Sequence, residues 1–170
     1  MRAPEPDTLR PIAGWPAPVS AILLAAWIGA ALYFSVVVTR AAFAVLPSRT
    51  MAGALVGQTL PVLFDTGMVV GVILVGAAIL SPAGAARTAS LAGGGAIFAL
   101  TALARFVILA RIARLRLSMP ATIDALPVGD PARRAFGQLH AMSVGALGLA
   151  MLIGLIVAIV LAHSLSLRRP

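Results

Sequence analysis

The most chemically distinctive residues of this sequence are charged side chains inside long apolar segments. Asp65 lies near the centre of one apolar segment, and Arg105 lies well inside the next. Each would cost about 2.5–3.5 kcal/mol at the centre of a transmembrane helix on insertion scales. Such a residue either binds a proton or a cation, or forms an ion pair that fixes the register of two helices. The sequence alone favours neither role.

Asp65 and Arg105 are expected to meet at a similar depth. By helical rise, Asp65 is about 22 Å from Leu80 at the end of its segment, and Arg105 is about 25 Å from Thr88 at the start of the next. A short turn joins the two segments, so their helices should be antiparallel neighbours. We therefore predict an Asp65–Arg105 ion pair that faces the interior of the bundle.

Further polar residues are expected at nearby depths. Gln58, Pro61 and Asp65 share one helix face, because residues three, four and seven positions apart lie on the same side of a helix. His140 and Ser143 are also three positions apart, in the last apolar segment. We predict one intramembrane polar layer, composed of Gln58, Asp65, Arg105, His140 and Ser143.

His140 is also a candidate ligand for haem or copper. His163 lies at the far end of the same segment, which is too distant to share a site, and the methionines do not cluster around His140. Cysteine is absent, which excludes disulfides, thiolate metal sites and thiol nucleophiles. A hydrogen-bonded structural histidine is favoured, with no metal and no cofactor. A haem- or copper-binding membrane redox protein that uses His140 is the alternative.

No arrangement typical of a soluble enzyme is present in the sequence. There is no phosphate-binding glycine loop and no HExxH motif, and Gly93, Gly94 and Gly95 lie in an apolar segment without the strand that a dinucleotide site needs. Serine, histidine and aspartate all occur, but Asp65 is expected to pair with Arg105, and nothing supports a catalytic triad. We therefore expect a non-enzymatic protein, either one that handles a solute or ion or an accessory subunit of a membrane complex.

The composition is that of an integral membrane protein. Of the 170 residues, 61% are hydrophobic and 11% are charged, compared with about 25% charged residues in soluble domains. The formal net charge is +8, and lysine is absent, so arginine alone supplies the positive charge. Arginines beside apolar segments favour anionic lipid headgroups over nucleic acid as partners. Other membrane subunits or a homo-oligomer are further candidate partners.

Four apolar segments are long enough to span a bilayer. We expect helices over residues 19–39, 52–80, 88–117 and 131–164, an irregular proline-rich tail over 1–18 and a basic tail over 165–170. Residues 19–164 should form one all-α, integral membrane, four-helix up-down bundle, because short connections make consecutive helices antiparallel. The first segment is longer than a signal-peptide core, so we expect it to remain uncleaved. Trp15 is expected in the interfacial aromatic belt.

Several residues have expected structural roles in these helices. Pro61 should kink the second helix, and Gly53-x-x-x-Gly57 and Gly67-x-x-x-Gly71 supply small faces for helix packing. Ser48 or Thr50 should cap the second helix, and Asp130 the fourth. Lipid headgroups are the expected contacts of the following arginines: Arg111, Arg114, Arg116, Arg133 and Arg134. The loops between helices one and two and between three and four hold seven arginines against five on the other side, which favours cytoplasmic loops.

The segment GAALYFSVVVTRAAFAVLPSRTMAGALVGQTLPVLFDTG resembles the first half of the transmembrane protein 205-like family, a bacterial and eukaryotic group of four-helix membrane proteins. RIARLR and FGQLHAMS are similar to its second half, and the resemblance covers about residues 20–160. It implies four helices and a location in the bacterial cytoplasmic membrane, but no established reaction. The family often has a polar residue, commonly Asn, where this chain has Leu147. A more remote likeness is to copper resistance protein D-like membrane proteins.

Overall fold

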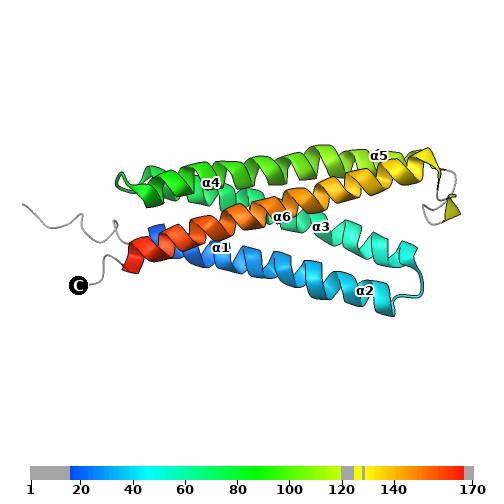
Figure 1. The fold of residues 1–170 in the computed structure, drawn as a ribbon, viewed down its shortest axis with the longest axis horizontal. Coiled ribbons are helices and arrows are strands. Elements are labelled where there is room, and N and C mark those ends of the chain that lie inside the picture. The colour runs from blue at the N-terminus through cyan, green and yellow to red at the C-terminus, as the bar shows by residue number, and fades with distance from the viewer. Residues whose placement is uncertain (1–15, 120–124, 128, 167–170) are drawn as a thin grey trace, which may run out of the picture.

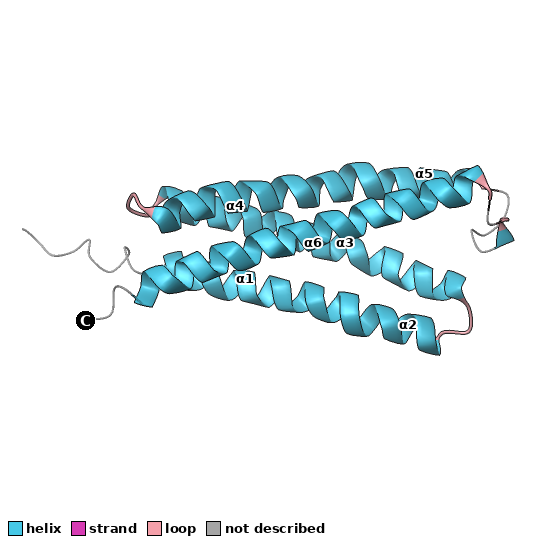
Figure 2. Cartoon of the chain, viewed as in Figure 1, coloured by secondary structure: helices cyan, strands magenta, loops and turns pink. Residues whose placement is uncertain are grey.

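The chain forms four long helical segments joined by short connections (Figures 1 and 2). The structure is a computed structural model that describes residues 16–119, 125–127 and 129–166, and within these ranges it contains helices and no strand. Each segment contains one apolar candidate membrane span, and these spans, Ala17–Val45, Arg49–Ile79, Ala85–Ser118 and Pro131–Ser166, have 29, 31, 34 and 36 residues. Since about 20 residues cross the hydrocarbon core of a bilayer, every segment is long enough to span it. The all-α, multi-pass membrane fold expected from the sequence is confirmed.

The first segment is composed of α1 (Pro16–Tyr33), the π-helical η2 (Phe34–Val38) and α2 (Thr39–Val45). It begins earlier than expected because Pro16 and Pro18 occupy its first turn, where the N–H groups that proline lacks have no helical partner. It also continues beyond residue 39, through the part expected to be a linker. The helix ends at Leu46, whose backbone is extended, because Pro47 disfavours a helical conformation in the residue before it. Trp15 and the tail over 1–15 lie outside the described residues.

The remaining helices begin at polar caps or at a turn. α3 (Arg49–Ile79) follows Ser48, whose hydroxyl accepts a hydrogen bond from the Met51 N–H at 3.2 Å. α6 (Pro131–Ser166) follows Asp130, whose Oδ1 accepts from the Ala132 N–H at 2.7 Å. Ser48 and Asp130 therefore cap these helices, as the sequence indicated. Residues 167–170 of the expected basic tail lie outside the described part of the chain.

The third segment is likewise built in three parts. It runs through α4 (Ala85–Ala102), the π-helical η3 (Leu103–Ile108) and α5 (Leu109–Ser118). It begins three residues earlier than residue 88, directly after the turn that contains Gly84.

α3 continues through Pro61 as one helix.

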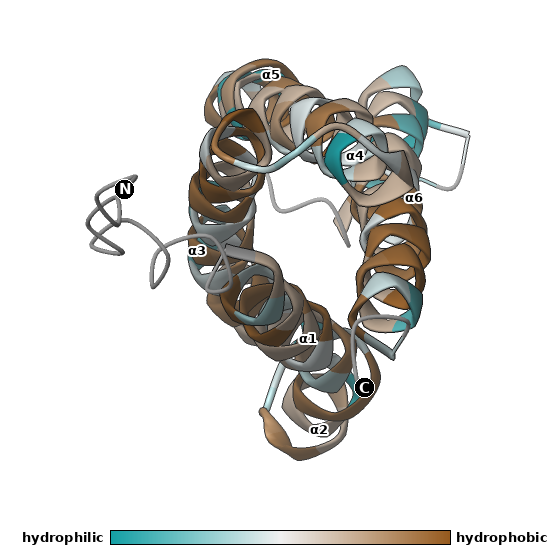
Figure 3. Ribbon diagram, turned by 90° about the vertical axis from the view of Figure 1, so that its left-hand side faces the viewer, coloured by the Kyte–Doolittle hydropathy of each residue, from teal (hydrophilic) through white to brown (hydrophobic). Residues whose placement is uncertain are grey.

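The four segments form a ring in which each packs on its two neighbours, as the end view in Figure 3 shows. α1 contacts α3 and α6, and α4 contacts α3 and α6. Consecutive segments are antiparallel (Figure 1), so the arrangement is an up-down bundle. Its core contains Phe64 and Ile97, both fully buried. The outward surface carries many exposed large apolar side chains, such as Ile22 and Ile159, which suits contact with lipid.

Glycines allow close helix contact in the half of the bundle around the α3–α4 turn, which we call the closed end. An added Cβ at Gly71 would lie 2.7 Å from the Gly94 carbonyl oxygen, and one at Gly94 would lie 2.9 Å from the Gly71 carbonyl oxygen. α3 and α4 therefore meet backbone to backbone. A Cβ at Gly93 would collide with Val157 of α6, and one at Gly154 of α6 would lie 3.3 Å from Leu24 of α1. Small residues at such contacts are typical of membrane helix packing.

Trp27 joins the first and second segments near the middle of the bundle. Its indole Nε1–H donates a hydrogen bond to the Leu63 carbonyl at 3.0 Å. The ring packs against Gly67, where an added Cβ would lie 2.8 Å from Trp27 Cζ2 and 2.7 Å from Thr101 Cγ2. Gly67 thus makes room for one side chain from each neighbouring helix. Toward the loops at residues 46–48 and 119–130, α2 and the first turns of α3 diverge from α5 and α6 (Figure 1), and we call this half the open end.

The contact between Gly71 and Gly94 predicts that alanine substitutions at two adjacent glycines, Gly94 and Gly95, have different effects on protein stability. Gly94→Ala should lower the free energy of unfolding by about 1–3 kcal/mol, because overpacking forces backbones or side chains apart. Gly95→Ala is the control, since nothing lies within 4 Å of an added Cβ there. Alanine is a better helix former than glycine, so Gly95→Ala should be neutral or slightly stabilising. Thermal unfolding in detergent, followed by circular dichroism, measures both. Equal midpoints for the two variants would contradict the close packing.

Candidate functional site

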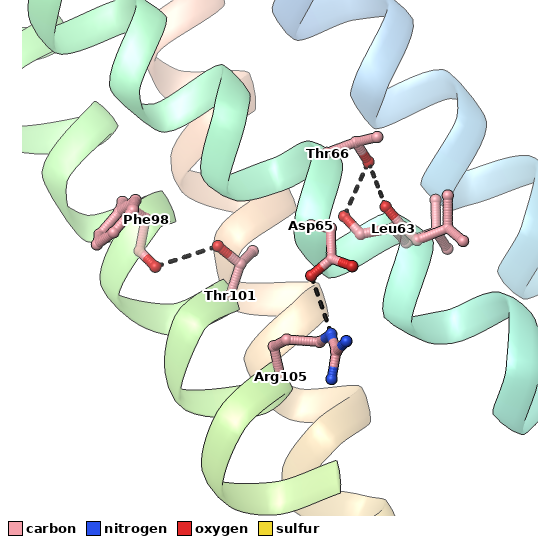
Figure 4. Close-up of polar contacts among 7 residues, drawn as sticks. Leu63, Asp65, Thr66, Phe98, Thr101 and Arg105 are labelled. Carbon is pink, nitrogen blue, oxygen red and sulfur yellow. Dashed lines mark hydrogen bonds and ion pairs between the residues drawn. The ribbon is translucent and has the colours of Figure 1, made fainter. Parts of the chain in front are cut away.

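The expected ion pair between Asp65 and Arg105 is present. Arg105 Nε donates to Asp65 Oδ1 at 2.9 Å, which joins α3 to η3 (Figure 4). The two residues meet because their helices are antiparallel and their distances from the shared turn match. In the described part of the chain Nε is the only Arg105 donor with a hydrogen-bond partner. Its two terminal nitrogens, with four N–H groups, are left for other partners.

The pair is not sealed inside the bundle, which corrects the expectation from the sequence. The side chain of Arg105 is 35% exposed and that of Asp65 is 48% exposed. The pair joins α3 to η3, and toward the open end the two segments that contain these elements diverge (Figure 1). It therefore lies beside the space between them. A half-exposed carboxylate inside an apolar segment is costly in contact with lipid, so it must contact a cationic partner or water.

Two π-helical segments, which the sequence analysis did not predict, lie next to this space. Each π turn adds a residue to the helix and rotates the side chains that follow. Arg105 lies within η3, and Thr39 directly follows η2. The Thr39 hydroxyl donates to the Phe34 carbonyl at 3.0 Å, and this oxygen of the π turn also accepts the Thr39 backbone N–H. Such segments are frequent at functional sites, and here they border the cavity described next.

A partly open cavity of about 1030 Å³ lies at the open end between α2, α3, η3, α5 and α6. Pro61 of α3 and Arg105 of η3 are the lining residues of these two segments farthest from the loops, and we call their end of the cavity the deep end; Arg49 and Arg116 line it nearer the loops. Helical rise places Arg105 about 16 Å from Arg116 along the segment. The polar residues that line it are Thr39, Arg49, Thr50, Arg105, Arg116, His140 and Ser143. None of the residues described around the cavity is acidic, and Asp65 lies beside the lining.

Arg116 points into this cavity, where the sequence analysis expected it to reach lipid headgroups. Its guanidinium lies over the ring of Phe136, 5.3 Å from the ring centroid. On the other side is α3, where a Cβ added at Gly57 would lie 3.3 Å from Arg116 Nη1 and one at Gly53 would lie 4.0 Å from Nη2. Gly53 and Gly57 therefore face an arginine side chain of α5, without the close approach of two backbones that is present at Gly71. The cause is the divergence of α3 from α5.

His140 and Ser143 line the cavity on the α6 side. The His140 ring stacks on Phe136 with a centroid distance of 6.1 Å and an interplanar angle of 7°. The buried Ser143 hydroxyl donates to the His140 carbonyl at 2.9 Å. Phe136 thus joins Arg116 and His140 in one stack. The FGQLHAMS motif held the only sequence signal for this stack, as Phe136 and His140 are one helical turn apart.

Gln58 does not belong to the same layer. Its side chain is exposed, and it is not among the residues that line the cavity. Gly57 and Pro61 face the cavity, four positions apart. Gln58 is one position farther along the helix than Gly57, about 100° around it, given 3.6 residues per turn. The predicted five-residue layer is therefore wrong at Gln58.

Of the other arginines expected to contact lipid headgroups, three are exposed on the outside of the bundle and one has a structural contact. Arg111, Arg114 and Arg134 are exposed and lie outside the cavity lining. Arg133 donates from Nη1 to the Leu126 carbonyl at 2.8 Å, which ties the start of α6 to the preceding loop. For metals, the described residues contain no group of three or more histidine, cysteine or acidic side chains. The haem or copper alternative for His140 gains no additional ligand from this geometry.

Residues 22–121 match the family described as Domain of unknown function (DUF4149). The chain belongs to this family. No curated protein and no solved structure matches the chain. The DUF4149 region contains the first helical segment from residue 22 onward and all of the second and third, with Asp65, Arg105 and Arg116. Phe136, His140 and Ser143 of α6 lie beyond it.

The Asp65–Arg105 contact predicts energetic coupling between the two residues. Asp65→Asn and Arg105→Gln should each lower stability, and the double variant should lose less than the sum of the two. We expect a coupling energy of about 0.5–3 kcal/mol, the range for residues in direct contact. Unfolding in detergent with a denaturant measures it. Gln58→Leu is the control and should be neutral, because Gln58 is exposed and, in the described part of the chain, no hydrogen bond joins it to Asp65 or Arg105. Additive losses would show that the pair does not stabilise the fold.

Proposed function

We propose that this protein is a non-enzymatic membrane protein that binds an amphipathic solute in the cavity of its open end. The observation that carries the proposal is the cavity itself, which combines cationic side chains with apolar walls inside a membrane-spanning bundle. Its volume of about 1030 Å³ is at the upper limit of small-molecule sites, which is about 1,000 Å³. A solute of this kind would place a polar group at the arginines and apolar atoms against α3 and α5.

The polar groups of the cavity support binding over catalysis. The Ser143 hydroxyl donates to a backbone carbonyl of its own helix, so it is not activated by a neighbouring imidazole. The Asp65 carboxylate accepts from Arg105, and its charge is thereby compensated. His140 stacks on Phe136. These contacts account for the serine, histidine and aspartate that a triad would need.

We also infer a location in the bacterial cytoplasmic membrane, with the two arginine-rich loops on the cytoplasmic side. The similarity of the GAALYFSVVV and FGQLHAMS segments supports a relationship to the transmembrane protein 205-like family. Membrane lipids are the expected partners, and other membrane subunits or further copies of this chain are candidate protein partners. Nucleic acid is not expected as a partner, because the arginines adjoin apolar helices.

Filling the cavity tests the proposal. Ala113 lines it, whereas Leu117, one turn farther along α5, is 88% exposed and does not line it. Native mass spectrometry of protein extracted in mild detergent should show a non-covalently bound small molecule on the wild type. Ala113→Trp should lose this molecule, because the indole occupies its place, and Leu117→Trp should retain it. Circular dichroism checks that both variants remain helical.

The proposal is overturned if the wild type carries no bound molecule, or if folded Ala113→Trp retains as much of it as Leu117→Trp does.

A further inference from the structure

The cavity has an excess of positive charge that the described residues do not neutralise. Of the two acids in the described part of the chain, Asp65 pairs with Arg105, and Asp130 caps α6. Arg49 and Arg116 line the cavity, and no ion pair is present for either within the described ranges. Two uncompensated guanidinium groups at the edge of an apolar cavity favour an anion between them.

Arg116 is held in position for such an anion. Its guanidinium lies between the Phe136 ring, at 5.3 Å, and the Gly57 backbone face of α3. No hydrogen bond from its side chain is present in the described part of the chain, so its N–H groups are available. The planar fork of a guanidinium matches the oxygens of a phosphate or carboxylate. Less side-chain freedom is lost on binding because the stack already restrains Arg116.

The remainder of the cavity is suited to hydrocarbon. Leu60 of α3 and Leu109 and Ile112 of α5 line the part between Arg116 and the deep end. At the deep end the charge of Arg105 is already compensated by Asp65. An apolar chain that ends there therefore does not lie against an unpaired charge. Arg116 lies near the end of its segment, at the level where phosphates of the bilayer are found, about 16 Å from Arg105 by helical rise.

We propose that the cavity binds one anionic phospholipid, with its phosphate at Arg116 and Arg49 and its acyl chain against Leu60, Leu109 and Ile112. This inference rests on the proposed function and specifies the solute. The charge selects an anionic lipid over a zwitterionic one, because a headgroup ammonium would meet the same arginines. The apolar length selects a lipid over a free anion, which would leave the wall of the cavity unfilled.

The test is a lipid titration of delipidated protein in an uncharged detergent. Phosphatidylglycerol and phosphatidylcholine with the same acyl chains are added, and native mass spectrometry measures the bound fraction. The wild type should bind phosphatidylglycerol about tenfold more tightly, as expected for charge-assisted hydrogen bonds to one phosphate. Arg116→Gln should abolish this preference. Arg114→Gln removes the same charge from the same helix outside the cavity, and it should retain the preference.

Two further variants keep the result independent of folding defects. Arg116→Lys should retain part of the preference, since it keeps the charge but loses the fork. Arg49→Gln should reduce the preference for phosphatidylglycerol to about half of the wild-type value. Arg49 is exposed at the first residue of α3, so folding should depend little on its side chain. Inorganic phosphate and glycerol 3-phosphate, which lack acyl chains, should not displace the lipid at millimolar concentration.

The inference is overturned by equal affinity of the wild type for both lipids, by equal effects of Arg116→Gln and Arg114→Gln in folded protein, or by displacement with inorganic phosphate, which would identify a free-anion site. Equal affinity for the two lipids, or equal effects of the two arginine variants, leaves the proposed function standing, because the loss of a bound molecule from Ala113→Trp tests that proposal separately. Displacement by inorganic phosphate would overturn both, because a free anion is not an amphipathic solute. Loss of all binding from the wild type would overturn both.

Discussion

The constraint on which this structure depends is the cost of a guanidinium group inside a membrane. Arg105 lies well inside its helix, and it is tolerated because Asp65 accepts its Nε–H at 2.9 Å and because a cavity adjoins it. The guanidinium of Arg116 lies over an aromatic ring and not beside a carboxylate, and the ring stabilises its positive charge less than a carboxylate would. The open end can hold these arginines only because α3 and α5 do not pack against each other there.

The closed end supplies the rigidity that the open end lacks. Gly71 and Gly94 bring α3 and α4 together, and Gly93 and Gly154 do the same for the contacts that α6 makes with α4 and α1. Trp27 then holds the first segment against Leu63 at the level where the helices begin to separate. The helices are thus closely packed at the closed end and separated at the open end. The ion pair and the two π-helical segments lie where these two halves of the bundle meet.

The sequence was sufficient for the features that follow from local composition and from counting along the chain. Four apolar segments predicted four helices, Ser48 and Asp130 predicted helix starts, and similar distances from one turn predicted the Asp65–Arg105 pair. Features that depend on the spacing between helices could not be obtained in this way. Gly53-x-x-x-Gly57 has the same form as Gly67-x-x-x-Gly71, but only the second pair is in tight contact with neighbouring helices. The first pair faces the long side chain of Arg116, because α3 and α5 are farther apart there. The π turns, which have no distinct sequence signal here, change which side chains face inward.

Thiol accessibility tests most directly whether the cavity exists and holds a lipid, because the natural chain contains no cysteine. Leu60 lines the cavity, whereas Val62, two residues away at similar depth, is 57% exposed on the outer surface. In delipidated protein a charged thiol reagent should modify Leu60→Cys and leave Val62→Cys, which detergent covers, unmodified. Phosphatidylglycerol should then protect Leu60→Cys, and phosphatidylcholine should not. Equal reactivity of the two cysteines, or none at Leu60→Cys, would contradict the account.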